Sequence, residues 1–178
     1  MRHMSILILA LLLCLALPCF AAADGIEISA LTPLPMTPAA ESQALDLYCG
    51  PTQGFYRHVN QTLDISTPYV YFGQYDCWAM VAQGTPDSFG PVGWVEAALL
   101  AELPAEPLLA FEDGLQVTVE DEAALTNDPM NPDAVIIIRI VPGTVVTLLA
   151  AYGDYAYVQA ELSDIDPVRA FIPMSAIE

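Results

Sequence analysis

Short apolar runs separated by turns recur along this chain, with no convincing helical period between them. Leu115, Val117 and Val119 alternate with polar residues, which is typical of a half-buried strand. Runs rich in β-branched and aromatic residues predict further strands at 69–73, 77–81, 93–95, 135–138, 145–150, 155–159 and 170–173. Pro142-Gly143 and Gly153-Asp154 are typical turns between strands. The pattern predicts an all-β chain built from small barrels.

One pattern occurs twice. Trp78-Ala79-Met80-Val81 is followed, sixteen residues after its tryptophan, by Trp94-Val95. Tyr155-Ala156-Tyr157-Val158 is followed at the same spacing by Phe171-Ile172, so the aromatic pairs are offset by 77 residues. Upstream, the similar segments 47–51 and 125–129 are offset by 78, and one inserted residue explains the difference. A single repetition of this length indicates two copies of a small domain rather than a solenoid.

The ends of the two copies divide the chain into five segments. Residues 1–23 have a basic start, an apolar run from Ile6 to Leu17 and small residues before Asp24, which predicts a secretory signal peptide and a secreted protein. The proline-rich segment 24–43 is predicted to be an extended arm. We expect the first barrel at 44–101, a linker with two prolines at 102–114 and the second barrel at 115–178.

The chain is strongly acidic, with a formal net charge of −18 and no lysine. After signal cleavage it keeps only Arg57, Arg139 and Arg169 as basic residues, against 22 acidic residues. Such a surface repels phosphate backbones and anionic lipid headgroups, so we expect no nucleic-acid partner and no membrane association after cleavage. The charge favours solubility outside the cell; the alternative is attraction of cationic partners or divalent ions.

Two cysteines and one histidine remain in the predicted mature chain. In an oxidising compartment Cys49 and Cys77 could form one disulfide within the first copy; the alternative is two small buried apolar residues. His58 follows Cys49 by nine residues, and a Cys-His pair is the minimum for a nucleophilic hydrolase. The other interpretation of His58 is a histidine beside Arg57 in the long loop after the first strand.

The segment from Asn127 to Asp133 places oxygen-bearing side chains at nearly alternate positions, which suits calcium. It lacks the glycine and the distal glutamate of an EF-hand loop, and two prolines stiffen it. A solvated acidic loop is the simpler interpretation, so we predict no metal site and no cofactor.

Short motifs in both copies are similar to those of one family. They are Gly50-Pro51 after an early strand, an aromatic residue followed three positions later by valine at Trp78/Val81 and Tyr155/Val158, and the closing strand Gly93-Trp94-Val95. Together they resemble the bacterial SH3 (SH3b) family, over nearly all the chain after Ala44. The second copy departs from the pattern, because Ala170 replaces the closing glycine and Asp128-Pro129 replaces Gly-Pro.

The resemblance implies a five-stranded antiparallel barrel in each copy. It also implies a secreted binding module, of a kind often attached to cell-wall hydrolases and thought to bind peptidoglycan or its peptides. The family pattern places Val81 and Val158 inside the barrels. Because alternate residues of a strand face opposite ways, Trp78 and Tyr155 are then expected to be partly exposed.

Exposed aromatic residues beside turn-rich loops suit the binding of extended peptides. We therefore predict a ligand-contact surface of Tyr56, Tyr75, Trp78 and Tyr155; the alternative is that these rings cover the barrel mouths or pack against the other unit. The first hypothesis is a non-enzymatic binding module for cell-wall peptide or an extracellular protein. The second is a structural or interaction protein whose barrels pack together or on a partner chain. The third is a small cysteine hydrolase.

Overall fold

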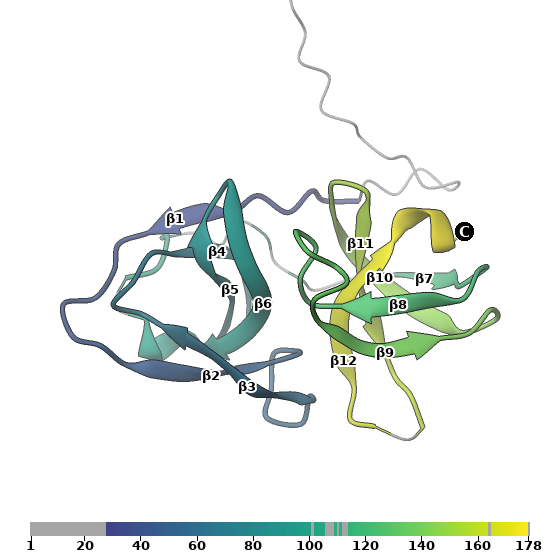
Figure 1. Ribbon diagram of the computed structural model, residues 1–178, viewed down its shortest axis with the longest axis horizontal. Coiled ribbons are helices and arrows are strands. Elements are labelled where there is room, and N and C mark those ends of the chain that lie inside the picture. Colours follow the sequence, from purple (N-terminus) through teal and green to yellow (C-terminus); the bar gives the residue numbers. More distant parts are fainter. Residues whose placement is uncertain are drawn as a thin grey trace, which may run out of the picture.

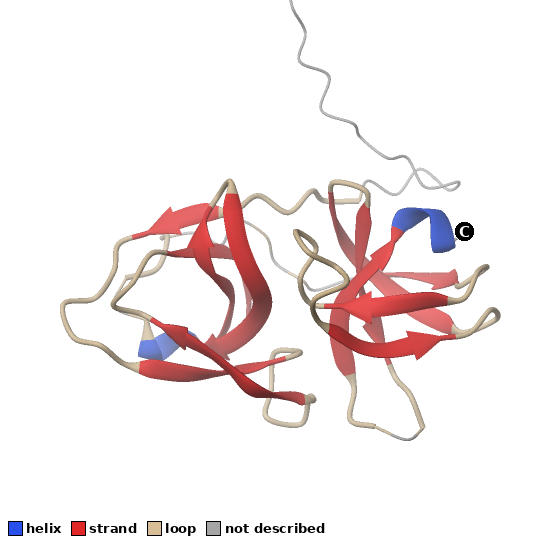
Figure 2. Ribbon diagram, viewed as in Figure 1, coloured by secondary structure: helices blue, strands red, loops and turns tan. Residues whose placement is uncertain are grey.

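The computed structural model describes residues 28–100, 102–105, 109, 111, 114–163 and 165–177, without the side chains of 58–60. The predicted signal peptide, residues 1–23, lies outside the described residues. Strands form nearly all of the regular structure, and the only helices in the described ranges are two short 3₁₀ turns (Figure 2). The strands belong to two six-stranded antiparallel sheets that lie side by side (Figure 1). The prediction of an all-β chain is confirmed.

The first sheet, with the 3₁₀ turn that follows it, is called the first unit. Its strand order is β1-β4-β5-β6-β2-β3. The elements are β1 (Leu34–Met36), β2 (Ala44–Tyr48), β3 (Arg57–Asp64), β4 (Tyr69–Tyr75), β5 (Trp78–Thr85), β6 (Ser88–Glu96) and η1 (Ala97–Leu99).

The second unit repeats this order, as β7-β10-β11-β12-β8-β9. Its elements are β7 (Leu115–Thr118), β8 (Ala123–Thr126), β9 (Ile136–Ile140), β10 (Val145–Tyr152), β11 (Tyr155–Ala160), β12 (Val168–Pro173) and η2 (Met174–Ala176). Each strand of the first unit thus has a counterpart six strands later.

The strand registers repeat as well. In the first unit Trp78 lies opposite Glu96, and in the second Tyr155 lies opposite Pro173, 77 residues later in each case. Similarly, Tyr48 pairs with Trp94 and Thr126 pairs with Phe171. A β-bulge interrupts the β4–β5 ladder after Tyr71 and the β10–β11 ladder after Leu148, again 77 residues apart. Residues related by 77, or by 78 in β2 and β8, are therefore called equivalent.

The predicted five-stranded barrels differ from the structure in strand number and in closure. Each sheet has six strands, and its two edge strands are not paired with each other. In the second unit one isolated bridge, Val119 to Ile177, joins the end of β7 to the chain after η2. In the first unit, β3 occupies a segment where the sequence predicted a loop around His58. The strand could not be recognised from its apolar pattern, because β3 is an edge strand with a mostly polar sequence.

Both segments predicted to lie outside the barrels are packed into the structure. The arm 24–43 contains β1, in which Pro35 lies opposite Val70 of β4. Proline is tolerated there because β1 is an edge strand. In the linker 102–114, Phe111 is buried and the carbonyl of Leu109 accepts the Gln74 N–H at 3.0 Å. Gly73 permits this approach, since a Cβ there would lie 2.5 Å from that carbonyl oxygen.

Buried apolar side chains form three clusters. One, around Leu63, Tyr71 and Val81, is the core of the first unit. Another, around Leu125 and Val158, belongs to the second unit. The third draws on both units, and we call it the shared cluster. Its largest members are Phe72, Trp78, Met80, Phe89, Trp94, Phe111, Tyr157 and Phe171.

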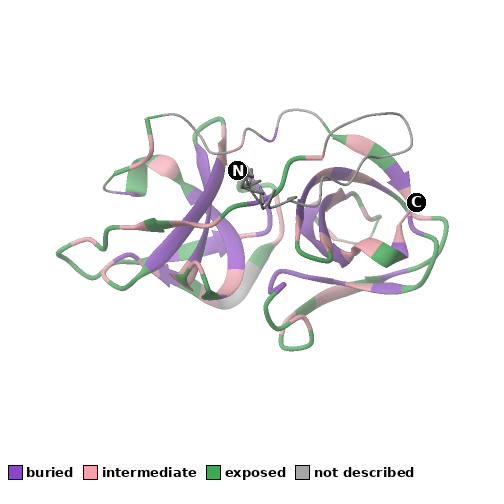
Figure 3. Cartoon of the chain, turned by 90° about the horizontal axis from the view of Figure 1, so that it is seen from above, coloured by how far each residue is buried: buried purple, intermediate pink, exposed green. Residues whose placement is uncertain are grey.

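The side chains of strand β5 contribute to two of these clusters. Ala79 and Val81 enter the core of the first unit, while Trp78 and Met80 enter the shared cluster. Burial on both faces explains why the strand is apolar from Trp78 to Ala82 rather than alternating with polar residues there. The predicted interior positions of Val81 and Val158 are confirmed, since both are fully buried. Figure 3 shows the long strands of both units buried along much of their length.

Candidate functional site: a groove on the first unit

The structure does not bring the four predicted contact residues together on one surface. Trp78 is buried, with 7% exposure, in the shared cluster. Tyr75 and Tyr155 are half-buried and pack against that same cluster. Tyr56 is half-buried against the core of the second unit, and it borders a separate open hollow near Asp166. All four rings thus pack, at least in part, against clusters that contain residues of the second unit.

Reciprocal backbone hydrogen bonds join the two units. Arg169 of β12 donates its N–H to the carbonyl of Cys49, and Val92 of β6 donates to the carbonyl of Asn127 at 2.7 Å. Arg169 is equivalent to Val92, and Asn127 is equivalent to Cys49. Each unit therefore offers the same strand and the same turn to the other, which is the arrangement of a two-fold symmetric interface within one chain.

Aromatic rings fill the space between these hydrogen bonds. The Trp94 indole N–H donates to the Tyr157 hydroxyl at 2.7 Å, and both residues are fully buried. Phe111, from the segment between the units, packs edge-on against Trp94 at 5.2 Å and against Tyr157 at 5.7 Å. Burial raises the pKa of the Tyr157 hydroxyl, so it stays protonated and accepts this bond as a neutral group.

Arg169 brings a buried cationic side chain to this contact. Its guanidinium carbon lies 5.1 Å from the ring centroid of Tyr75, 5.6 Å from that of Trp94 and 5.8 Å from that of Phe55. Nε donates to Gln159 at 3.0 Å, whereas Nη1 has no hydrogen-bond partner among the described residues. Desolvation lowers the pKa of this guanidinium. Three aromatic faces therefore hold the cation in place of a carboxylate.

The predicted cysteine chemistry is not supported by the positions of the thiols. Cys49 is buried and Cys77 is exposed in the β4–β5 turn, and no disulfide joins these two residues. Burial raises the pKa of the Cys49 thiol to about 12, so the nucleophilic thiolate is scarce at neutral pH. His58 belongs to β3 rather than to a loop, and its side chain lies outside the described residues.

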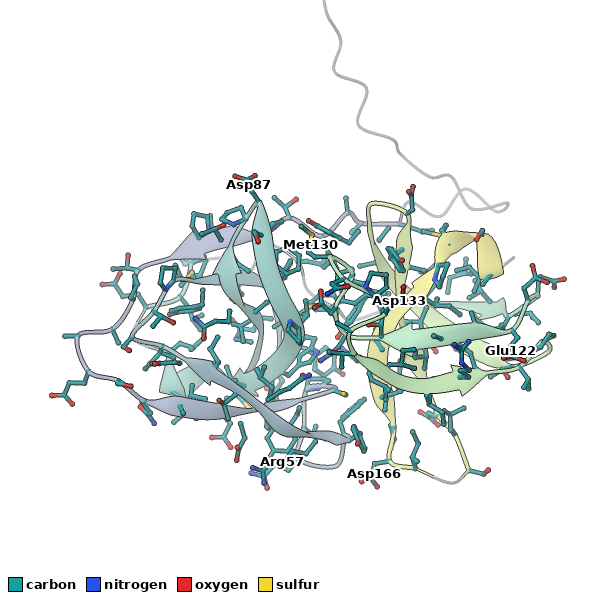
Figure 4. All side chains as sticks on the ribbon, viewed as in Figure 1. Arg57, Asp87, Glu122, Met130, Asp133 and Asp166 are labelled. Atoms are coloured by element: carbon teal, nitrogen blue, oxygen red, sulfur yellow. The ribbon has the colours of Figure 1, made fainter. Side chains whose placement is uncertain are left out.

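The acidic loop from Asn127 to Asp133 makes hydrogen bonds within itself and to the first unit. Asn127 and Asp128 are buried, and the Asn127 amide nitrogen donates to Gln61 of the first unit at 2.9 Å. The Asp128 carboxylate accepts the backbone N–H of Asn131 at 2.9 Å. Figure 4 shows Met130 and Asp133 on this loop, beside the first unit. Within the described part of the chain, no three His, Cys, Asp or Glu side chains could share a metal ion.

A groove of about 250 Å³ lies on the first unit, bordered by β2, β5, the end of β6 and η1. Its apolar lining includes Tyr48, Trp78 and Leu99. The rings of Tyr48 and Trp78 meet edge to face, with centroids 5.5 Å apart and an interplanar angle of 81°. Leu99 remains 42% exposed at the edge of the groove.

Polar side chains form the rest of the groove. Asp46 forms an ion pair with Arg57, with 2.6 Å between Oδ1 and Nη2. Figure 4 shows Arg57 on the outer side of β3. Glu96 is exposed and receives only a 3.5 Å hydrogen bond from the Gln53 amide. No ion pair to Glu96 occurs among the described residues. The groove thus combines an aromatic floor with one neutralised and one uncompensated carboxylate.

Of the groove residues, only Trp78 is among the contact residues predicted from the sequence. Tyr48 and Glu96 were missed because they are far apart in sequence, and only the β2–β6 and β5–β6 pairings bring them to Trp78. A signal was present in the repeat itself. Tyr48 has Thr126 as its equivalent and Glu96 has Pro173, so these two positions differ in chemistry between the two copies.

Among the described residues, no helix has the length and apolar character that a bilayer crossing requires. Comparisons with protein-family models, with curated proteins and with solved structures find no match to this chain.

Proposed function

We propose that this chain is a secreted, non-catalytic binding protein built from two SH3-like units of the SH3b type. Its groove on the first unit takes an extended peptide, either a cell-wall peptide or a segment of an extracellular protein. Support for the SH3-like assignment comes from the β4-β5-β6 meander, its repetition as β10-β11-β12, and the short 3₁₀ turn after each meander. Support for secretion comes from the composition of residues 1–23.

The observation that carries the binding proposal is the aromatic floor of the groove. Tyr48 and Trp78 line the space together with the polar side chains of Asp46, Gln53 and Glu96. Ligand sites typically combine an apolar lining with a few placed polar groups. Grooves lined by aromatic residues also bind extended peptides, because such peptides lose little conformational freedom on binding.

The two tryptophans of the chain provide a direct test. In a ¹⁵N NMR titration of the mature protein with soluble muropeptides, the indole signal of Trp78 should shift in a saturable way. The indole signal of Trp94, which is buried against Tyr157, should stay in place. Leu99→Ala should weaken binding, while Val141→Ala, a truncation at an exposed site of the second unit, should leave it unchanged. A titration in which Trp78 does not respond to muropeptides would refute this proposal for wall peptides.

A second candidate function is that of a structural or interaction protein without a small ligand. It is favoured by the shared cluster, because Tyr75 and Tyr155 pack there instead of facing a ligand. In that case cross-linking on cells should capture a protein partner while purified muropeptides leave Trp78 unchanged. Leu99→Ala should then reduce the yield of the cross-linked partner if the groove is the contact surface.

A further inference from the structure

We propose that the groove selects a peptide side chain ending in a primary ammonium group, as lysine does. This inference rests on the proposed peptide-binding function and specifies its ligand. The occupant of the groove is a single long aliphatic side chain whose charged end reaches Glu96.

The size and lining of the groove fit one such side chain. Its volume of about 250 Å³ is below the roughly 300–1,000 Å³ of sites that enclose a whole small molecule. Tyr48, Trp78 and Leu99 belong to its apolar lining. The methylene stem of a lysine-type side chain packs well against such surfaces while its ammonium group stays at the polar end.

The charges of the groove favour a cation at one end only. Asp46 is already paired with Arg57 at 2.6 Å, so this end is electrically balanced. Glu96 has no ion pair among the described residues, and its backbone lies opposite that of Trp78 in the β5–β6 ladder. An ammonium group near Glu96 would gain a carboxylate partner, in a space that the Tyr48 and Trp78 rings also line. The net charge of −18 adds a long-range attraction for cationic ligands.

The second unit lacks this combination at the equivalent positions. Pro173 replaces Glu96, Thr126 replaces Tyr48, and Ala176 replaces Leu99. Thr126 and Ala176 are moreover buried. The protein therefore binds one ammonium-bearing side chain per chain, although its fold is duplicated.

The test compares two synthetic peptides with blocked ends, Ala-Lys-Ala and the same peptide with Nε-acetyl-lysine. Binding to the full mature chain is followed by the indole NMR signal of Trp78, with Trp94 as the internal reference. We expect about two- to fivefold tighter binding of the free ammonium peptide, which is the range for one exposed ion pair. The preference should decrease at 0.5 M salt.

Glu96→Gln should abolish this preference. The matched control Glu122→Gln, at an exposed acidic residue of the second unit, should retain it. Because acetylation changes the peptide and not the protein, the comparison with the wild-type chain stands even if a variant fails to fold.

The outcomes separate this inference from the proposed function. If muropeptides shift Trp78 but acetylation of their free amine, or of the synthetic lysine, does not weaken binding, the ammonium inference is overturned and the peptide groove remains. If muropeptides and both synthetic peptides all leave Trp78 unchanged, the proposed function fails together with the inference. A stoichiometry of two ammonium sites per chain would contradict the assignment to the first unit alone.

Discussion

The two units share a strand order and a register, yet the same place on each has a different surface. Next to Trp78 the first unit carries Tyr48 and Glu96, and an open groove lies among them. Next to Tyr155 the second unit carries Thr126 and Pro173. Duplication of the fold has therefore not duplicated the candidate site. The two units therefore share the packing of their strands. They differ in the side chains at the groove positions.

The contact between the units shows the opposite behaviour. Equivalent residues of both units, such as Trp94 and Phe171, lie in one shared cluster, and equivalent backbone groups exchange hydrogen bonds. Arg169 is the main departure from this symmetry, because its equivalent is Val92. The symmetric contact holds the chain together, and the asymmetric groove distinguishes its two halves.

The largest expected effect concerns whether the two units unfold together. Trp94→Ala and Phe171→Ala each remove a fully buried ring from the shared cluster, so each should reduce the free energy of unfolding by about 3–5 kcal/mol. Calorimetry should show one transition that moves to lower temperature in both variants. Two separate transitions, of which only one responds to each variant, would show that the units are energetically independent.

A second comparison uses Arg169, where the symmetry of the contact is broken. Arg169→Ala removes the contacts with three rings and should cost about 2 kcal/mol. Arg169→Met keeps most of the packing and removes a buried cation with an unpartnered Nη1, so its cost should be close to zero. Urea denaturation of both variants measures the difference. Equal losses in the two variants would show that the charge itself stabilises the contact.

The third comparison concerns Cys49 and its equivalent, Asn127, which has no ionisable side chain. Folding raises the pKa of the Cys49 thiol from 9.0 to about 12, so above pH 9 the unfolded chain releases a proton that the folded chain retains. The free energy of unfolding should therefore fall by about 1.4 kcal/mol per pH unit between pH 9 and 12 through this group. Urea titrations at pH 8, 9, 10 and 11 should show this loss.

Replacement of the thiol provides the control for that measurement. Cys49→Ala should show a smaller alkaline loss than the wild-type chain, with the remainder coming from buried tyrosines such as Tyr157. Identical pH profiles for the two proteins would contradict the burial of a protonated thiol at this position.

The smallest effect is expected at two equivalent turns. Asp76 has a φ of 51° in the β4–β5 turn, and Gly153 has a φ of 54° in the β10–β11 turn. Because glycine adopts this conformation without strain, Asp76→Gly should stabilise the chain by about 0.5 kcal/mol and Gly153→Asp should destabilise it by a similar amount. Thermal melts of the two variants at matched pH should move in opposite directions. Shifts of the same sign would show that the two turns are not comparable.

Much of the strand pattern could be predicted, because apolar residues with β propensity occupy β5, β11 and β12 and the repeat links them. Three elements escaped prediction for physical reasons. Strand β1 contains Pro35, which argues against a strand except at an edge. Strand β3 is polar because it too lies at an edge. Phe111 lies among prolines and acidic residues, and only tertiary packing makes it part of the core.

The candidate site was harder to predict than the fold. An aromatic residue of a strand reveals its own face by alternation, but not what covers that face. Tyr75 and Tyr155 were therefore predicted as ligand contacts although they pack in the shared cluster. The burial of the Arg169 guanidinium could not be predicted either, because arginine is rarely buried without a carboxylate partner. Such positions depend on the mutual packing of two units, which strand periodicity does not encode.

The reciprocal backbone bonds between Cys49 and Arg169 and between Asn127 and Val92 have a consequence for how the chain could be divided. Either half expressed alone would leave a large aromatic face and a polar turn facing water, so it should aggregate or dimerise with itself. Co-expressed as separate polypeptides, the halves should instead recombine into the native pair. The chain is thus expected to behave as a dimer whose two subunits are covalently linked. Replacing one unit by an unrelated domain should therefore destabilise the other unit.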